Sequence, residues 1–346
     1  MAAGYSLVPT DLTALPGFEA DDHLEAWTVF LRTCRAVAVG APAVRVGASA
    51  DKAFVALCDK LLRETAPSTT QAARGSILEN FSAFRIEPRG EPGFLTGYFE
   101  PEIEGSLEPS SEFTAPIYGL PDDLRRASSS TDYDDRARIE TKGLGGRATT
   151  LVYLRDHVEA FIVHVQGSAR VKLRDGSTIR LTYGGRNGLP YTSIGKLILA
   201  AGAIRPEDMS LDRLKDFLRG EPNGGRRWMH QNRSFIFFAR DRDAGSADGP
   251  IGGAGIRLSP LRSIAIDRTI WPYGHFFWFD ADLPWRSDHV APFQRLMVAQ
   301  DTGSAIIGPA RADVFFGRGE DPGRRAGQIR HATQMHVLLP KLAVVP

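Results

Sequence analysis

One short segment of the sequence places a carboxylate where it could act as a catalytic acid. Residues 296–308 read LMVAQDTGSAIIG, an apolar run that ends at Asp301 and is followed by small residues. Such a strand would hold the Asp301 carboxyl in a turn whose backbone amides can approach a ligand closely. Burial beside Val298, Ile306 or Ile307 would raise the pKa of this carboxyl, and a protonated carboxyl can donate its proton.

Two other interpretations of this segment stay open on these residues alone. Aspartate often caps a turn through its side chain, and Asp301 could do only that. The pattern is also typical of an aspartic protease, in which two aspartates share one proton. The chain contains a single Asp-Thr-Gly sequence, so a protease would need a second copy of the chain to supply the other aspartate.

A second carboxylate, Asp313, follows twelve residues after Asp301. The residues between them could form a turn that returns the next strand beside the first one. An ionised Asp313 within about 6 Å would raise the pKa of Asp301 and keep it protonated at mildly acidic pH. We therefore expect Asp313 to support Asp301.

The elements that must position these carboxylates are predicted to be short strands preceded by a helical layer. Apolar residues at spacings of three and four predict helices throughout the first 85 residues, the third of them over 68–84. After Pro88 the sequence changes to short apolar runs between glycine and proline, which predict strands. Because no alternation of strands and helices persists, compact barrels are favoured over a doubly wound sheet.

The clearest strand pair is a hairpin over 171–183, whose arms flank Asp175-Gly176, a dipeptide that suits a tight two-residue turn. Further strands are predicted at 93–99, 161–165, 235–239, 263–266, 276–279, 296–299, 314–316 and 335–339. Short helices are predicted at 192–201 and 206–218, and a surface excursion at 121–147.

Composition excludes several classes of function. The 42 Lys and Arg residues nearly balance the 41 Asp and Glu residues, so no charge favours nucleic acid as a partner. No apolar run reaches the roughly 18 to 20 residues of a transmembrane segment. The histidine spacings predict no metal site. Cys34 and Cys58 lie on apolar faces of predicted helices, where we expect buried thiols rather than a disulfide.

Four segments in a fixed order carry a resemblance to a known family. They read FLTGYFEP at 94–101, VQGSA at 165–169, YGGRNGLPYTSIGK at 183–196 and DTGSAIIG at 301–308. Together they resemble the MltA family of membrane-bound lytic murein transglycosylases. Asp267, Asp301 and Asp313 resemble the three aspartates for which the C-terminal 3D region of that family is named.

The resemblance implies a mainly β fold with an N-terminal helical layer. A double-psi β-barrel domain would comprise residues 1–100 and 233–346. It would be interrupted by a second, smaller β-barrel domain at 101–232, with a groove between the two for a glycan strand. In the loop after Asp301, Ser304 replaces a glycine that is usual in the family.

The resemblance also implies a peptidoglycan lytic transglycosylase that cleaves the MurNAc-β-1,4-GlcNAc bond without water and leaves a 1,6-anhydromuramyl product. Asp301 would act as acid and then as base, without a metal or an organic cofactor. Asp267 and Asp313 would support it. The residues expected to contact the glycan are Tyr98, Gln166, Gly167, Ser168, Tyr183, Asn187 and Tyr191. The alternatives are an aspartic protease-like hydrolase and a non-catalytic peptidoglycan-binding protein.

A murein substrate implies a location outside the cytoplasmic membrane. Residues 1–16 lack the basic and apolar regions of a secretory signal. We therefore expect a periplasmic protein of a Gram-negative bacterium whose full-length precursor supplies an export signal or a lipid anchor for the outer membrane.

Overall fold

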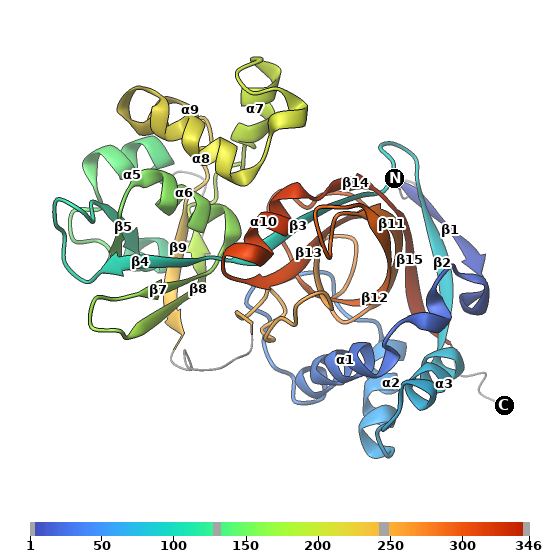
Figure 1. The fold of residues 1–346 in the computed structure, drawn as a ribbon. Coiled ribbons are helices and arrows are strands. Elements are labelled where there is room, and N and C mark those ends of the chain that lie inside the picture. Colours follow the sequence, from blue (N-terminus) through green and yellow to red (C-terminus); the bar gives the residue numbers. More distant parts are fainter. Residues whose placement is uncertain (1–3, 127–132, 242–248, 342–346) are drawn as a thin grey trace. The chain divides into compact units, whose positions relative to one another are not determined.

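The computed structural model describes residues 4–126, 133–241 and 249–341. The chain forms two units, which are drawn as a ribbon in Figure 1. The split unit comprises Met1–Tyr98, Ile251–Gly317 and Arg325–Pro346, and the inserted unit comprises Phe99–Pro250 and Arg318–Arg324. Each unit has its own sheet and hydrophobic core. The domain boundaries that the resemblance implies stay a prediction.

The N-terminal part of the split unit contains the expected helical layer. Its elements are β1 (Tyr5–Thr10), two 3-10 turns, α1 (His23–Ala38), α2 (Lys52–Arg63) and α3 (Thr70–Asn80). Asp22, Asp51 and Thr69 cap the three α-helices by accepting a hydrogen bond from a backbone amide of the first turn.

The prediction of helix for the whole of the first 85 residues was wrong at two places. Residues 5–10 form β1, and α3 ends at Asn80, after which the chain continues as β2 (Phe81–Pro88). Phe81 and Ala83 are buried on one face of β2, which pairs with β1 on one side and with the last strand on the other. This pairing with distant strands overrides the local helical spacing.

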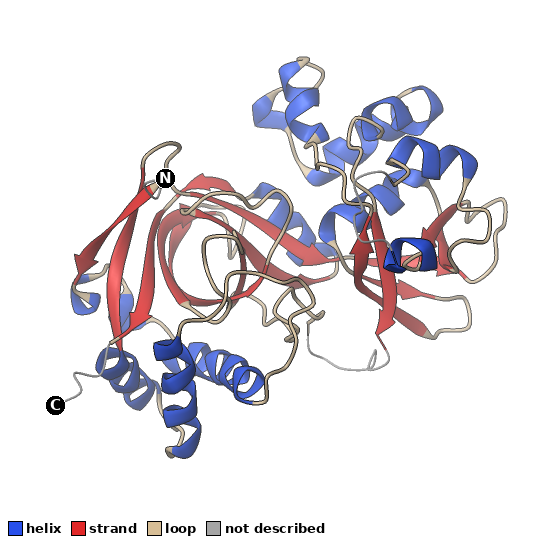
Figure 2. Cartoon of the chain, turned by 180° about the vertical axis from the view of Figure 1, so that it is seen from behind, coloured by secondary structure: helices blue, strands red, loops and turns tan. Residues whose placement is uncertain are grey.

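The split unit is built on a nine-stranded sheet in the order β1-β2-β15-β11-β12-β10-β13-β3-β14. The strands not yet given are β3 (Phe94–Glu100), β10 (Ser263–Ile266), β11 (Phe276–Leu283), β12 (Ala291–Asp301), β13 (Arg311–Arg318), β14 (Arg330–Ala332) and β15 (Gln334–Pro340), with α10 (Glu320–Gln328) before β14. Trp27, Phe30 and Phe54 of the helices pack with Phe276 and Val298 of the sheet in one core. The strands and helices are distinguished by colour in Figure 2. A mainly β fold with N-terminal helices is thereby confirmed.

The inserted unit contains a six-stranded sheet in the order β5-β6-β4-β7-β8-β9. Its strands are β4 (Glu102–Ser106), β5 (Ala115–Tyr118), β6 (Thr150–Leu154), β7 (Ala169–Lys172), β8 (Thr178–Arg186) and β9 (Ile236–Asp241). Its α-helices are α4 (Asp122–Arg126), α5 (Arg136–Lys142), α6 (His157–Gln166), α7 (Ile194–Ala200), α8 (Leu211–Gly220) and α9 (Arg226–Met229). In the part of the chain that the structure describes, no helix is long and apolar enough to span a membrane.

Two local predictions for the inserted unit need correction. The strand predicted at 161–165 is part of α6, which begins after the cap Asp156 and ends before the cap Gly167, a residue with φ of 81°. The hairpin between β7 and β8 is confirmed, but its turn is longer than two residues because the Leu173 amide donates to the Ser177 carbonyl. Within the expected surface excursion, 127–132 lie outside the described residues, whereas Arg136 of α5 is buried.

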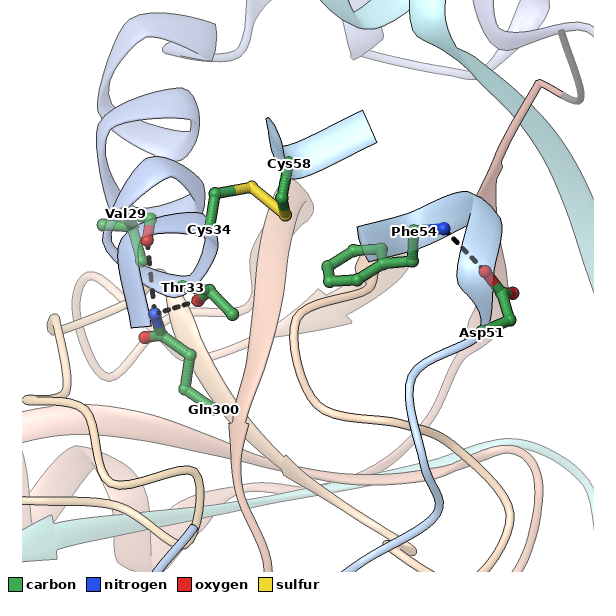
Figure 3. The surroundings of a disulfide bond; sticks show 7 residues. All are labelled: Val29, Thr33, Cys34, Asp51, Phe54, Cys58 and Gln300. Carbon is green, nitrogen blue, oxygen red and sulfur yellow. Dashed lines mark hydrogen bonds between the residues drawn. A yellow bond between two sulfur atoms is a disulfide. The ribbon is translucent and has the colours of Figure 1, made fainter. Parts of the chain in front are cut away.

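The two cysteines form a disulfide between α1 and α2 (Figure 3), so the expectation of two buried thiols was wrong. Cys34 and Cys58 are fully buried, and their Cα atoms lie 4.8 Å apart, a separation that a disulfide spans. Both cysteines lie on apolar faces, as the sequence indicates, but those faces meet each other. Only the packing of α1 against α2 reveals the pairing.

Candidate active site

The end of β12 is fixed to the helical layer by Gln300, the residue before Asp301. The Gln300 side-chain amide donates to the Val29 carbonyl (3.2 Å) and to Thr33 Oγ1 (2.9 Å) of α1, as Figure 3 shows. Its side-chain oxygen accepts a hydrogen bond from Ser263 Oγ (2.6 Å) of β10. A register shift between β10 and β12 then places Asp301 opposite Ala265. These contacts set the position from which the Asp301 side chain projects.

Three donors surround the Asp301 carboxyl. Tyr98 Oη donates to Oδ2 (2.8 Å), while the backbone amides of Gly253 (2.7 Å) and Thr302 (2.8 Å) donate to Oδ1. The approach of Gly253 requires glycine, because a Cβ there would lie 2.6 Å from Tyr273 Oη. Residues far apart in the sequence therefore converge on one carboxyl group.

Burial raises the pKa of Asp301, and this is the largest influence on it. The hydrogen bonds from Thr302, Gly253 and Tyr98 and the positive charge of Arg45 act in the opposite direction. Of the three apolar residues expected to shield the carboxyl, Ile306 packs in one cluster with Tyr98. Val298 packs toward the helices instead, and Ile307 is 75% exposed.

Asp313 does not lie on the strand beside Asp301, contrary to the expected return of the chain. β10 runs between β12 and β13 and pairs with both. Asp313 Oδ1 accepts a hydrogen bond from Thr96 Oγ1 (2.6 Å), and Thr96 Oγ1 accepts one from the Arg311 guanidinium (2.7 Å). Burial is the main cause that raises the pKa of Asp313, and the negative charge of Asp301 adds to it.

Asp267 holds the loop that follows the candidate acid. Its Oδ1 accepts hydrogen bonds from the amide (3.0 Å) and hydroxyl (2.6 Å) of Thr269, and its Oδ2 accepts one from the Gly308 amide (2.8 Å). Thr302 Oγ1 donates to the Ile266 carbonyl (2.9 Å) nearby. Both carboxylate oxygens of Asp267 thus bind backbone or side-chain donors of its own unit.

The other predicted site residues are placed as follows. Tyr98 is buried and donates its hydroxyl to Asp301. Gln166 ends α6 and accepts a hydrogen bond from the Phe99 amide (3.0 Å). Gly167 has the left-handed backbone of the helix cap, and Ser168 after it is buried. Tyr183 in β8 and Tyr191 before α7 are half-buried.

Asn187 is fully buried in a network of backbone groups. Its amide nitrogen donates to the carbonyls of Asp134 (3.0 Å) and Arg233 (2.9 Å), and its oxygen accepts from the amides of Phe235 (2.9 Å) and Leu189 (3.4 Å). The side chain joins separate segments of the inserted unit. Its contribution to glycan binding stays a prediction.

Arg45 is a residue of this site that sequence reasoning missed. Its guanidinium donates to the Thr302 carbonyl (2.8 Å) and approaches Ser304 Oγ (3.5 Å). The segment around Arg45 has no periodic pattern that would mark it. The sequence signal for a neighbour of Asp301 is the distant pair Gly252-Gly253, because glycine permits two backbones to approach closely. Within the described residues, no group of three His, Cys, Asp or Glu side chains could hold a metal ion. The expected absence of a metal and cofactor stays a prediction.

Two family models match the chain. The MltA specific insert domain matches residues 94–239, and the 3D domain matches residues 262–339. Among curated relatives, membrane-bound lytic murein transglycosylase A of Vibrio cholerae is 35% identical over 68% of this chain and 62% of its own length. The protein of that name from Escherichia coli K12 is 34% identical over 70% of this chain and 65% of its own length. The chain thus spans less than two thirds of these two relatives.

Solved structures match almost the whole chain. A membrane-bound lytic murein transglycosylase from Agrobacterium tumefaciens is 31% identical, with a TM-score of 0.85 over 97% of this chain and 98% of the other. E. coli MltA with bound chitohexaose is 25% identical, with a TM-score of 0.70 over 99% of this chain and 96% of the other. With the two domain matches in the expected order, these likenesses show that the chain belongs to the MltA family of lytic murein transglycosylases.

Proposed function

We propose that this protein is a peptidoglycan lytic transglycosylase in which Asp301 is the catalytic acid and then the base. The observation that carries the proposal is a single carboxyl group with a raised pKa that accepts three hydrogen bonds. The names of the relatives in the same family support a murein substrate.

The proposed reaction moves one proton out of Asp301 and one back to it. The protonated carboxyl gives its proton to the oxygen between MurNAc and GlcNAc as the glycosidic bond breaks. The resulting carboxylate takes a proton from the muramyl C6 hydroxyl, whose oxygen closes the 1,6-anhydro ring. No water is consumed, and one group can serve in both steps. Tyr98, Gly253 and Thr302 donate hydrogen bonds that stabilise the carboxylate between the steps.

The glycan-binding residues are also a proposal. We infer that Tyr183 and Tyr191 stack on sugar rings and that Gln166, Gly167 and Ser168 form a turn that hydrogen-bonds the substrate. The chitohexaose in a related structure supports an oligosaccharide as the ligand type. For Tyr98 the hydrogen bond to Asp301 favours a role at the acid itself.

The products distinguish this function from its alternatives. Purified murein digested by the protein should release muropeptides that mass spectrometry finds one water lighter than hydrolytic products. A hydrolase would release reducing sugars, which requires two carboxyl groups at the bond. An aspartic protease-like enzyme would cut the peptides and leave the glycan intact. Binding without any soluble product would indicate a non-catalytic peptidoglycan-binding protein.

We propose a periplasmic location for this protein. We also propose that its precursor carries a lipid anchor that holds it to the outer membrane. Murein lies outside the cytoplasmic membrane, and relatives are named membrane-bound. The Cys34–Cys58 disulfide supports an oxidising compartment, because thiols in the cytosol are generally kept reduced. Fractionation of cells that express the native gene tests the location, and recovery only with the cytosol would contradict it.

A further inference from the structure

The segment between α1 and α2, residues 39–51, reaches the candidate acid although neither matched family region includes it. It begins five residues after Cys34 and ends seven residues before Cys58, so it lies within the loop that the disulfide closes. Arg45 lies in the middle of this segment and is half-buried.

Arg45 contacts both residues whose amides bind the Asp301 carboxyl. Its guanidinium donates to the carbonyl of Thr302 (2.8 Å), and its own backbone amide donates to the carbonyl of Gly253 (3.0 Å). The amides of Thr302 and Gly253 in turn donate to Asp301 Oδ1. Arg45 therefore binds the carbonyl groups of both residues whose amides are the donors to Asp301.

The position of Arg45 is itself fixed by the neighbouring chain. Tyr273 Oη donates to the Arg45 carbonyl (3.0 Å), and the Ala48 amide donates to the Arg268 carbonyl (2.6 Å). The Arg268 guanidinium also donates to the Val46 carbonyl. These bonds join Arg45 and the residues that follow it to the residues that precede β11, and they hold the Arg45 backbone at the site.

We propose that Arg45 is a positioning residue for the reaction: it aligns the Gly253 and Thr302 amides on Asp301 and supplies a positive charge beside it. The inference rests on the proposed function and assigns a role to a segment outside the matched family regions. Among the described residues, Tyr98, Tyr273 and Asp313 are titratable groups that also interact with Asp301. Arg45 alone among these four carries a positive charge.

The charge of Arg45 has a defined chemical consequence. It favours the ionised form of Asp301 and so lowers the pKa that burial raises. The acid must release its proton in the first step, and the carboxylate formed then gains stabilisation from Arg45 and from the two aligned amides. Without Arg45, Asp301 should bind its proton more tightly, and the amides of Gly253 and Thr302 should be less well aligned with its carboxyl group.

The test measures the proton affinity of Asp301 directly, by 13C NMR titration of the carboxyl signals in protein labelled at aspartate. The Asp301 signal is assigned by its loss in Asp301→Asn. In Arg45→Gln we expect its titration midpoint to rise by about one pH unit, a tenfold gain in proton affinity. The control is Arg35→Gln, which removes an equal charge from an exposed position of α1 and should leave the midpoint unchanged.

Arg45→Lys separates charge from geometry. It keeps the positive charge but not the planar guanidinium that reaches Thr302 and Ser304. Because the charge remains while the alignment of the two amides is lost, we expect the Asp301 midpoint to rise by less than in Arg45→Gln, while kcat on murein falls and KM changes little. This variant also carries the test if Arg45→Gln does not fold, because a Lys variant with both the midpoint and the kcat of the parent would contradict the role of Arg45 in aligning the amides.

The two proposals can fail separately. An unchanged Asp301 midpoint in Arg45→Gln, or an equal rise in Arg35→Gln, overturns the role of Arg45 whatever the protein does to murein. If the parent releases no anhydro product while the midpoint still rises in Arg45→Gln, the proposed function is wrong and the electrostatic role of Arg45 stands.

Discussion

Asp301 and Asp313 lie on the two strands that flank β10, and Ala265 is the register partner of both. Partners on neighbouring strands point to the same face of a sheet, so the two carboxyl groups share one face about two strand spacings apart, or roughly 9 to 10 Å between Cα atoms. Burial is the largest cause that raises the pKa of each carboxyl group, and the negative charge of Asp301 also raises the pKa of Asp313. Because the repulsion between two negative charges is mutual, ionisation of either carboxyl group disfavours ionisation of the other.

This arrangement predicts how stability depends on pH. Each carboxyl has a folded-state pKa above the ordinary value of 3.8, so the folded protein binds these protons more tightly than the unfolded chain does. Their favourable contribution is complete below about pH 3.8 and is lost as the pH rises through the raised pKa. Asp301→Asn should accordingly increase the free energy of unfolding at neutral pH, with the gain disappearing toward pH 3.8.

Urea unfolding of the parent and of Asp301→Asn over a pH series measures this difference. Asp282→Asn, at an exposed position of β11, is the matched control and should not reproduce the effect. A gain for Asp301→Asn of the same size at every pH would show that the amide acts through packing rather than through the removal of a buried charge.

Asp301→Asn should also abolish turnover while it preserves the fold. The amide oxygen can still accept from Gly253 and Thr302, but the side chain cannot donate and recover the proton. General acid–base groups contribute on the order of 10² to 10⁴ in rate, so digestion of purified murein should fall at least about a hundredfold. Asp282→Asn should keep the rate of the parent. Residual activity of the Asn variant above about a hundredth would rule out Asp301 as the acid.

Tyr98→Phe should shift the pH dependence of the reaction. The hydroxyl of Tyr98 stabilises the ionised form of Asp301 through a 2.8 Å hydrogen bond, and burial raises the pKa of Tyr98 so that the hydroxyl keeps its proton. A hydrogen bond to a charged group contributes about 1.5 to 3 kcal/mol, so its loss should raise the pKa of Asp301 by roughly one unit or more.

The alkaline limb of the kcat profile should then move to higher pH, because Asp301 must be protonated to act first as an acid. Tyr153→Phe, on β6 of the inserted unit, is the matched control. If Tyr98→Phe lowers kcat equally at every pH, Tyr98 serves to orient a group other than the Asp301 proton.

Local sequence patterns predicted where the strands around the site lie in the sequence, but they did not predict which strands pair with one another in the sheet. Residues 263–266 form β10 as predicted, and the apolar run before Asp301 forms the end of β12. The insertion of β10 between β12 and β13 was not predictable, because strand order depends on contacts between distant segments. For the same reason the sequence indicated a carboxyl in a turn but not its donors Tyr98 and Gly253.

Two segments show how one local sequence pattern can fit different structures. The apolar run at 161–165 reads equally as a buried strand or a buried helix, and the caps Asp156 and Gly167 decide for the helix. Asn187 is predicted to bind the substrate, which stays a prediction, and in the structure its side chain bonds four backbone groups of the inserted unit. A polar residue in a glycine-rich turn does not reveal from sequence whether it binds a ligand or the backbone.

The last prediction concerns the Cys34–Cys58 disulfide, which joins residues 24 apart in the sequence. A cross-link that closes a loop of this length stabilises the folded state by about 3 kcal/mol, chiefly by restricting the unfolded chain. The double variant Cys34→Ala, Cys58→Ala should unfold at a lower urea concentration, with a free energy of unfolding about 3 kcal/mol below that of the parent. Reductant should leave the unfolding curve of this variant unchanged. The parent unfolded with reductant should move toward the curve of the variant. Equal stability of the parent and the double variant without reductant would contradict a bridge between α1 and α2.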